Sequence, residues 1–191
     1  MKTTIKTIAF VFFIQLAGYI AMAQVQYQQK NDFNLTVNGT STLHDWEMKT
    51  SKIACNATFT FYEDGELGGL TLLNFTMPAE SLKSERSGMD DNAYRALKTS
   101  KYPTITFDLT TATVSSEGTV ISCKGKLSLA GVTKDIDLLA KSKLNTDKSI
   151  NIKGSKKINM RDFGIDPPSF MMGAVKTGEN VTISFDLTFR H

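Results

Sequence analysis

The sequence predicts an all-β domain with roughly eight antiparallel strands and one short helix. Three observations predict this. Apolar residues recur with a period of two in most segments, which gives each strand one dry face and one wet face. Turn-forming residues separate these segments at short intervals. The period becomes helical in one segment only, residues 87–101. A sandwich and a closed barrel both fit this pattern.

The N-terminal segment has the three parts of a secretory signal. Lys2 and Lys6 form a basic start, an apolar run over residues 8–20 follows, and small residues stand at the positions that a signal peptidase reads. The run is shorter than the ~20 residues of a spanning helix. No cysteine follows it that could carry a lipid. We therefore expect a signal peptide over 1–23, one mature domain over 24–191, no stable membrane anchor, and a periplasmic or secreted protein.

The charge balance excludes one class of partner. The precursor has a net charge of +3, and removal of Lys2 and Lys6 leaves 20 basic and 19 acidic residues, or +1. Binding to nucleic acid relies on neutralising phosphates with a surplus of basic residues. We expect no nucleic-acid partner.

The first half of the mature chain reads as strands. Residues 33–37 alternate between apolar and polar, and the next run, 40–62, alternates clearly at its C-terminal end. A further strand over 68–77 closes at Pro78. We expect these segments to be neighbouring antiparallel strands.

Residues 87–101 break the strand pattern. Ser87 and Asp90 have the S-x-x-D form of a capping box, and apolar residues at helical spacing follow over 93–97. Pro103 prevents the helix from continuing. We expect one short helix here, with a strand starting directly after the proline.

The clearest β-hairpin lies over residues 119–144. Each arm has one apolar and one polar face, and Gly131 stands between the arms, where a tight turn commonly needs positive φ. Two more strands follow, over 150–158 and 181–189. Between them lies a loop with two prolines.

The sequence lacks the residue sets of common enzymes and metal proteins. It has only two histidines, His44 and His191, and no Cys-x-x-Cys, G-x-S-x-G or glycine-rich nucleotide fingerprint. We expect no catalytic residues, no metal site and no cofactor.

Cys55 and Cys123 both fall on the inward face of their strands. A secreted protein can keep a disulfide. The pattern leaves two alternatives open: two buried thiols, or one bridge between strands.

Three polar or amphipathic residues are candidates for a pocket mouth. His44 and Trp46 are either a strand-end histidine and a core tryptophan, or a pair that orients a polar head group at a pocket. Arg161 either forms an ion pair with an acidic neighbour or clamps an anion.

Four motifs, in order along the chain, resemble the YceI-like family of lipocalin-like, polyisoprenoid-binding proteins. They are an N-terminal segment, a short helix with the strand that follows it, a hairpin, and a loop before the last strand. These segments are 39–46 (GTSTLHDW), 89–97 with 101–107 (MDDNAYRAL and KYPTITF), 125–134 (GKLSLAGVTK) and 161–165 (RDFGI).

The resemblance implies an extended, eight-stranded, lipocalin-like β-barrel that holds an isoprenoid or similar lipid without catalysis, for transport or storage. Inward apolar residues would form the wall, although the same residues would also suit a solid core. They are Phe59, Phe61, Ile105, Phe107, Leu127, Leu129, Ile136, Leu138, Ile183, Phe185 and Leu187.

One alternative function remains open. A barrel with a filled core could act through a protein partner in envelope stress or surface interaction. Phe170, Met171 and Met172 in the proline loop would then form an apolar contact patch. The sequence leaves the oligomeric state open, a homodimer included.

Overall fold

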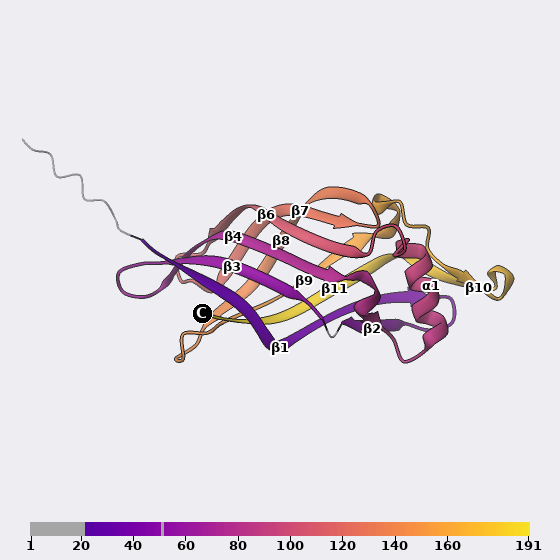
Figure 1. Ribbon diagram of the computed structural model, residues 1–191, viewed down its shortest axis with the longest axis horizontal. Coiled ribbons are helices and arrows are strands. Elements are labelled where there is room, and N and C mark those ends of the chain that lie inside the picture. The colour runs from indigo at the N-terminus through magenta and orange to yellow at the C-terminus, as the bar shows by residue number, and fades with distance from the viewer. Residues whose placement is uncertain (1–21, 51) are drawn as a thin grey trace, which may run out of the picture.

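The chain folds into a closed, elongated antiparallel β-barrel, which confirms the predicted class (Figure 1). The computed structural model describes residues 22–50 and 52–191. The predicted signal peptide lies outside this range except for Met22 and Ala23. None of the helices in the described part is long and apolar enough to span a membrane.

Eight strands form the barrel, and each pairs with the next in the order β1, β3, β4, β6, β7, β8, β9 and β11, with β11 closing on β1. Their bounds are β1 Ala23–Ser41, β3 Ala54–Phe61, β4 Leu67–Pro78, β6 Thr104–Val114, β7 Val120–Leu129, β8 Val132–Leu144, β9 Ile150–Asn159 and β11 Val175–Arg190.

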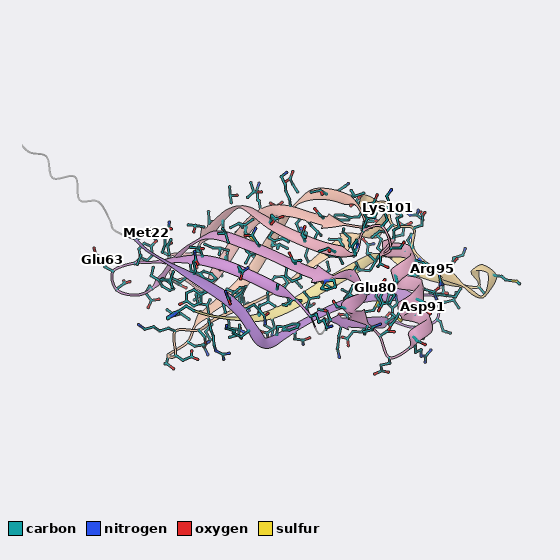
Figure 2. All side chains as sticks on the ribbon, in the orientation of Figure 1. Met22, Glu63, Glu80, Asp91, Arg95 and Lys101 are labelled. Carbon is teal, nitrogen blue, oxygen red and sulfur yellow. The ribbon has the colours of Figure 1, made fainter. Side chains whose placement is uncertain are left out.

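Shorter elements gather at one end of the barrel, where Figure 1 shows α1, β2 and β10. We call it the helix end. These elements are β2 Trp46–Thr50, η1 Ala79–Ser81, β5 Leu82–Lys83, α1 Ser87–Leu97, η2 Met160–Phe163, β10 Ser169–Phe170 and η3 Met171–Gly173. The opposite end, which we call the far end, carries the β3–β4 loop and the C-terminus. In Figure 2, Glu80, Asp91, Arg95 and Lys101 mark the helix end, while Met22 and Glu63 mark the far end.

The predicted hairpin is confirmed as β7 and β8. Its turn residues, Ala130 and Gly131, both have positive φ, 50° and 84°, as a two-residue turn matched to the strand twist requires. The ring of Tyr102 covers Gly131, where an added Cβ would lie 2.3 Å from its Cζ. The turn therefore closes against the segment that follows α1.

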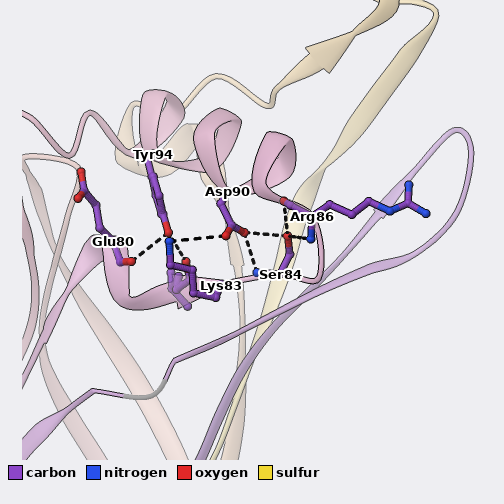
Figure 3. Close-up of polar contacts among 7 residues, drawn as sticks. Glu80, Lys83, Ser84, Arg86, Asp90 and Tyr94 are labelled. Carbon is purple, nitrogen blue, oxygen red and sulfur yellow. Dashed lines mark hydrogen bonds and ion pairs between the residues drawn. The ribbon is translucent and has the colours of Figure 1, made fainter.

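The predicted helix is also confirmed, but the capping box is wrong. The N-cap is Arg86, and its side chain makes no capping bond. The buried Asp90 carboxylate instead accepts hydrogen bonds from the backbone N–H and the hydroxyl of Ser84, both at 2.7 Å (Figure 3). Asp90 is itself buried, and a buried carboxylate needs such hydrogen-bond partners.

Tyr94 fastens the middle of α1 to the same segment. Its hydroxyl lies 2.8 Å from the Leu82 carbonyl oxygen and 3.0 Å from that of Glu80. The hydroxyl has one proton, so it donates to one of these two oxygens at a time. The ammonium of Lys83 lies 4.9 Å from the centre of its ring. These contacts hold α1 against β5 and η1 (Figure 3).

The far end of the barrel is filled by packed rings. Phe59 and Phe189 are almost fully buried and meet edge to face at 5.7 Å between ring centroids. Tyr27 packs on Phe59 at 5.4 Å and donates its hydroxyl proton to the Lys148 carbonyl, at 3.0 Å. Such edge-to-face rings bury a large apolar area and exclude water. This cluster closes the barrel at its far end.

Candidate functional site

The barrel encloses a cavity of about 580 Å³ between the packed rings of the far end and the helix end. Inward side chains from all eight barrel strands line it, and residues of α1 and β2 line its helix end. Phe59 and Phe189 belong to its lining and form its floor. The volume lies in the range of about 300–1,000 Å³ that is usual for sites of small organic ligands.

The wall residues in the middle of the barrel face this space directly. Ile136, Leu138, Ile183 and Phe185 point inward by the alternation of their strands, yet each is only half-buried. A side chain in a solid core would be fully buried. The accessible surface of these residues faces the cavity, so the barrel is not filled along its whole length. The filled core of the alternative function is therefore wrong for this part of the barrel.

The predicted wall residues line the cavity with one exception. Those that line it are Phe59, Ile105, Phe107, Leu127, Leu129, Ile136, Leu138, Ile183, Phe185 and Leu187. Phe61 does not, because β3 carries it past the floor to the far end, where its ring lies 6.2 Å from that of Tyr27. A role for the lining residues in ligand binding stays a prediction.

His44 and Trp46 lie at the helix end and line the cavity. The Trp46 indole nitrogen donates to the Thr40 carbonyl at 3.1 Å, which fixes the ring across the β1–β2 connection. His44 is exposed, and its Nδ1 lies 2.6 Å from the Asp45 carbonyl oxygen. Both residues therefore line the helix end of the cavity, and a role in orienting a head group stays a prediction.

Arg161 lies outside the cavity, in η2. Its Nε donates to Glu179 at 2.6 Å and its terminal nitrogen to Asp166 at 3.3 Å. The Arg161 guanidinium holds the pKa of the Glu179 carboxyl below its ordinary value. Of the two alternatives for Arg161, the structure shows the ion pair, and the expected place at the pocket mouth is wrong.

The two cysteines are free, buried thiols that line the cavity. Cys55 lies on β3 and Cys123 on β7, with β4 and β6 between them in the barrel. A disulfide needs close approach of the two Cα atoms, and this strand order prevents it, so the bridge is wrong. Burial raises the pKa of the Cys55 thiol to about 12. The pKa of the Cys123 thiol is also raised, mainly by burial and to a smaller extent by the negative charge of Asp137.

The proline loop divides between the cavity and the surface. Phe170 is half-buried and lines the cavity, whereas Met172 is fully exposed. The side chain of Met171 lies outside the described part of the structure. The three residues therefore do not form one exposed patch in the described structure.

Two cations in the lining were missed from the sequence. Lys156 of β9 is separated from Ile152 and Ile158 by an even number of residues, so it points to the same inward face. The alternation of the strand therefore did indicate that this lysine faces the interior. Arg86 precedes α1 and lines the helix end. Nothing in the sequence pattern indicates that the helix would face the barrel opening.

The described residues offer no metal site. No group of three or more histidine, cysteine, aspartate or glutamate side chains within 22–50 and 52–191 is placed to hold an ion. The site consists of an apolar wall, a closed floor, and a mouth with a few polar side chains.

Solved structures with the same architecture cover most of this chain. BcnA of Burkholderia cenocepacia matches with a TM-score of 0.68 and 15% identity, over 82% of this chain and 95% of BcnA. A polyisoprenoid binding domain from Saccharophagus degradans, implicated in plant cell wall breakdown, matches with a TM-score of 0.63 and 12% identity, over 86% and 97% of the two chains. The YceI protein of Campylobacter jejuni matches with a TM-score of 0.55 and 20% identity, over 70% and 79%. At these identities the structures show a shared fold.

No curated protein sequence matches the chain. The profile of the YceI-like domain, however, matches residues 21–189, which is nearly the whole described barrel. The four sequence motifs, the closed eight-stranded barrel and this match agree, and the chain belongs to the YceI-like family.

Proposed function

We propose that this protein binds a long-chain isoprenoid, or a similar amphiphilic lipid, and holds it inside the barrel for transport or storage without catalysing a reaction. The observation that carries the proposal is the cavity itself. It is apolar over most of its length and closed by aromatic rings at the far end, and its polar lining residues, apart from Lys156 and the two cysteine thiols, lie toward the helix end.

The physical chemistry of a polyprenyl chain suits such a space. The chain is almost pure hydrocarbon, and each methylene that leaves water contributes ~0.8 kcal/mol. A wall of leucine, isoleucine and phenylalanine offers no group that would compete for hydrogen bonds. We infer that the tail points to the floor formed by Phe59 and Phe189, and that the head group stays at the mouth near Trp46.

Family membership supports the ligand class. The structural neighbour from Saccharophagus degradans is described as a polyisoprenoid binding domain, and its fold covers most of this chain. We infer the same class of ligand here, at the level of a long apolar chain with a small head group.

The N-terminal signal pattern supports export. We propose that residues 1–23 are removed and that the mature protein carries its lipid in the periplasm or outside the cell. N-terminal sequencing of protein from the native host should give Gln24 as the first residue, and an N-terminus at Met1 would contradict export by cleavage.

The test of the proposed function is native mass spectrometry of the mature protein from its own host, followed by organic extraction. We expect a discrete adduct whose extract is a polyprenyl chain or a related lipid. Protein shown to be folded that carries no adduct, and that takes up no geranylgeraniol after mixing, would contradict the proposal.

Leu138 and Leu139 provide a matched pair of variants on β8. Leu138 lines the cavity, whereas Leu139 is 63% exposed on the outer face. Leu138→Trp should fill the cavity and reduce lipid uptake at least about tenfold, and Leu139→Trp should bind as the wild type does. Circular dichroism verifies that both variants are folded. Equal uptake by the two would show that the lipid binds elsewhere.

A further inference from the structure

The lysine at position 156 faces the interior of the barrel. Lys156 pairs with Ile183 across β9 and β11, both side chains line the cavity, and Lys156 is half-buried. Its neighbour Lys157 pairs with Thr182 and is exposed on the outer face. Adjacent lysines of one strand thus lie on opposite sides of the barrel wall.

The ammonium of Lys156 has no counter-charge. Within the described part of the chain it makes neither a hydrogen bond nor an ion pair, and no aspartate or glutamate lines the cavity. Lys153, on the outer face of the same strand, instead pairs with Asp186 at 3.0 Å. A charge that faces apolar surface without a partner is unfavourable unless water or a ligand compensates it.

Lys156 lies in the middle of the barrel, one step along the inward face from the level of Trp46. Its partner Ile183 is in register with Val37 of β1, and Val37 is in register with Met48 of β2. Trp46 at the mouth is two residues from Met48, which is one step along the same inward face. The long stem of a lysine at this level can extend its charge from the middle of the barrel toward the mouth, where the head group of a lipid would stay.

The backbone pairing of β8 with β9 does not extend as far as Lys156. The pairing of β8 with β9 ends at Ala140 and Gly154, so residues 155–159 of β9 have no partner on β8. The backbone pairing of the two strands therefore ends two residues before Lys156.

A second cation lines the same end. Arg86 precedes α1, and its side chain extends away from the Ser84–Asp90 network (Figure 3). Its guanidinium has no ion pair among the described residues. The cavity lining therefore contains two cations without an ion pair, the half-buried Lys156 and the exposed Arg86, and no carboxylate.

We propose that Lys156 binds an anionic head group, a phosphate or a carboxylate, on the lipid that the cavity holds, and that Arg86 adds a second positive charge at the mouth. This inference rests on the proposed lipid-binding function and deepens it. Charge-assisted hydrogen bonds from an ammonium to such an anion are among the stronger polar contacts in proteins. The apolar wall would hold the tail, and Lys156 would select the head group.

The test compares two lipids of equal chain length, geranylgeranyl phosphate and geranylgeraniol, on the delipidated mature protein. The wild type should bind the phosphate at least about tenfold more tightly than the alcohol, as expected for a hydrogen bond to a charged group. Lys156→Met should lose this preference and still bind the alcohol. Lys156→Arg, which keeps the charge, should retain it.

Lys157→Met is the matched control, because it removes the same charge from the outer face of the same strand. It should keep the wild-type preference, and thermal melts should show all variants folded. Inorganic phosphate in excess should not displace the phosphorylated lipid, since the tail supplies most of the affinity.

The outcomes separate the two proposals. Binding of both lipids with equal affinity, or a preference that survives Lys156→Met, would overturn the head-group assignment and leave the lipid-binding function intact. Displacement by inorganic phosphate alone would show a site for a free anion and would also overturn it. Failure to bind either lipid would overturn the lipid-binding function, and this inference with it.

Discussion

The indole of Trp46 fills the space above Gly39, where an added Cβ would come within 2.2 Å of the ring atom Cζ2. The two residues are paired partners of β2 and β1. The bond from the indole to the Thr40 carbonyl fixes the ring in this place. The absence of a side chain at Gly39 therefore determines where the only tryptophan of the chain lies at the mouth.

We expect Gly39→Ala to displace the Trp46 ring. The methyl group would occupy the position of the indole, so the ring would move toward water and lose its bond to Thr40. The tryptophan emission should shift to longer wavelength, and lipid affinity should fall several-fold. Fluorescence of the purified variant, with and without lipid, measures both effects.

Gly88→Ala is the control for this substitution. Gly88 lies in α1 with no atom within 4 Å of an added Cβ, and its φ is not positive. Alanine there should leave the emission unchanged and stabilise the helix by up to ~1 kcal/mol. A Gly39→Ala variant with wild-type emission would show that the ring is not held by the close approach to Gly39.

The floor and the wall of the cavity should respond differently to truncation. Phe59 is fully buried between aromatic rings, so Phe59→Ala should lower the free energy of unfolding by about 3–5 kcal/mol. Ile183 already faces open space, so Ile183→Ala removes fewer contacts and should cost no more than about 2 kcal/mol.

Urea unfolding of the delipidated protein compares the two variants. Equal losses at both positions would mean that the barrel is packed equally tightly along its length, which would contradict a hollow middle. Saturation with lipid should increase the stability of the wild type, because a ligand that binds only the folded state stabilises it.

The fold could be predicted because its rules are local. The alternation of β7 and β8 sets which side chains point inward, and Gly131 marks the turn between them. These features depend on near neighbours and on the period of a strand. The placement of most predicted wall residues in the lining follows from the same parity.

The parts that could not be predicted depend on distant contacts. Alternation gives the face of Phe61 but not its position along the barrel, so it could not reveal that Phe61 lies past the floor. It also could not place β4 and β6 between Cys55 and Cys123. A hollow and a solid barrel have the same inward residues, since the difference lies in how closely opposite walls approach. Lys156 was overlooked because a lysine in a strand is ordinarily outward.

The thiols should be unreactive in the folded protein. The pKa of Cys55 is about 12 and that of Cys123 is raised as well, so both stay protonated at pH 8, and the thiolate is the reactive form. Labelling with iodoacetamide should be very slow in the native state. When the protein is unfolded without a reductant, iodoacetamide should label both thiols rapidly.

Ala54→Cys provides the control on β3, since Ala54 is exposed next to Cys55. This variant should take one label rapidly in the native state, which shows that the reagent is active. A wild type that shows no free thiol after unfolding would contradict the two free cysteines of the structure.

The carboxylate of Asp186 should make stability depend on pH. It accepts hydrogen bonds from the Asn151 amide at 2.7 Å and from the Lys153 ammonium at 3.0 Å. Both bonds lower the pKa of Asp186, and the bond from Asn151 has the larger effect. Because the pKa is lower in the folded state, the ionised carboxylate stabilises the fold, and it does so in full at pH values above the pKa of aspartate in the unfolded chain, which is ~3.9. This contribution is lost as the pH falls through the pKa of the folded state.

Asp186→Asn should therefore cost no more than about 1 kcal/mol at neutral pH, because the pair is partly exposed and water screens it. The difference from wild type should shrink as the pH falls below ~4. Asp135→Asn is the control, because Asp135 pairs with Lys126 at the same 3.0 Å but its side chain is 75% exposed, against 37% for Asp186. Urea unfolding across this pH range compares the two variants. A cost for Asp186→Asn that stays constant into acid would show that it arises from packing, since the ionised carboxylate contributes only where it carries its charge.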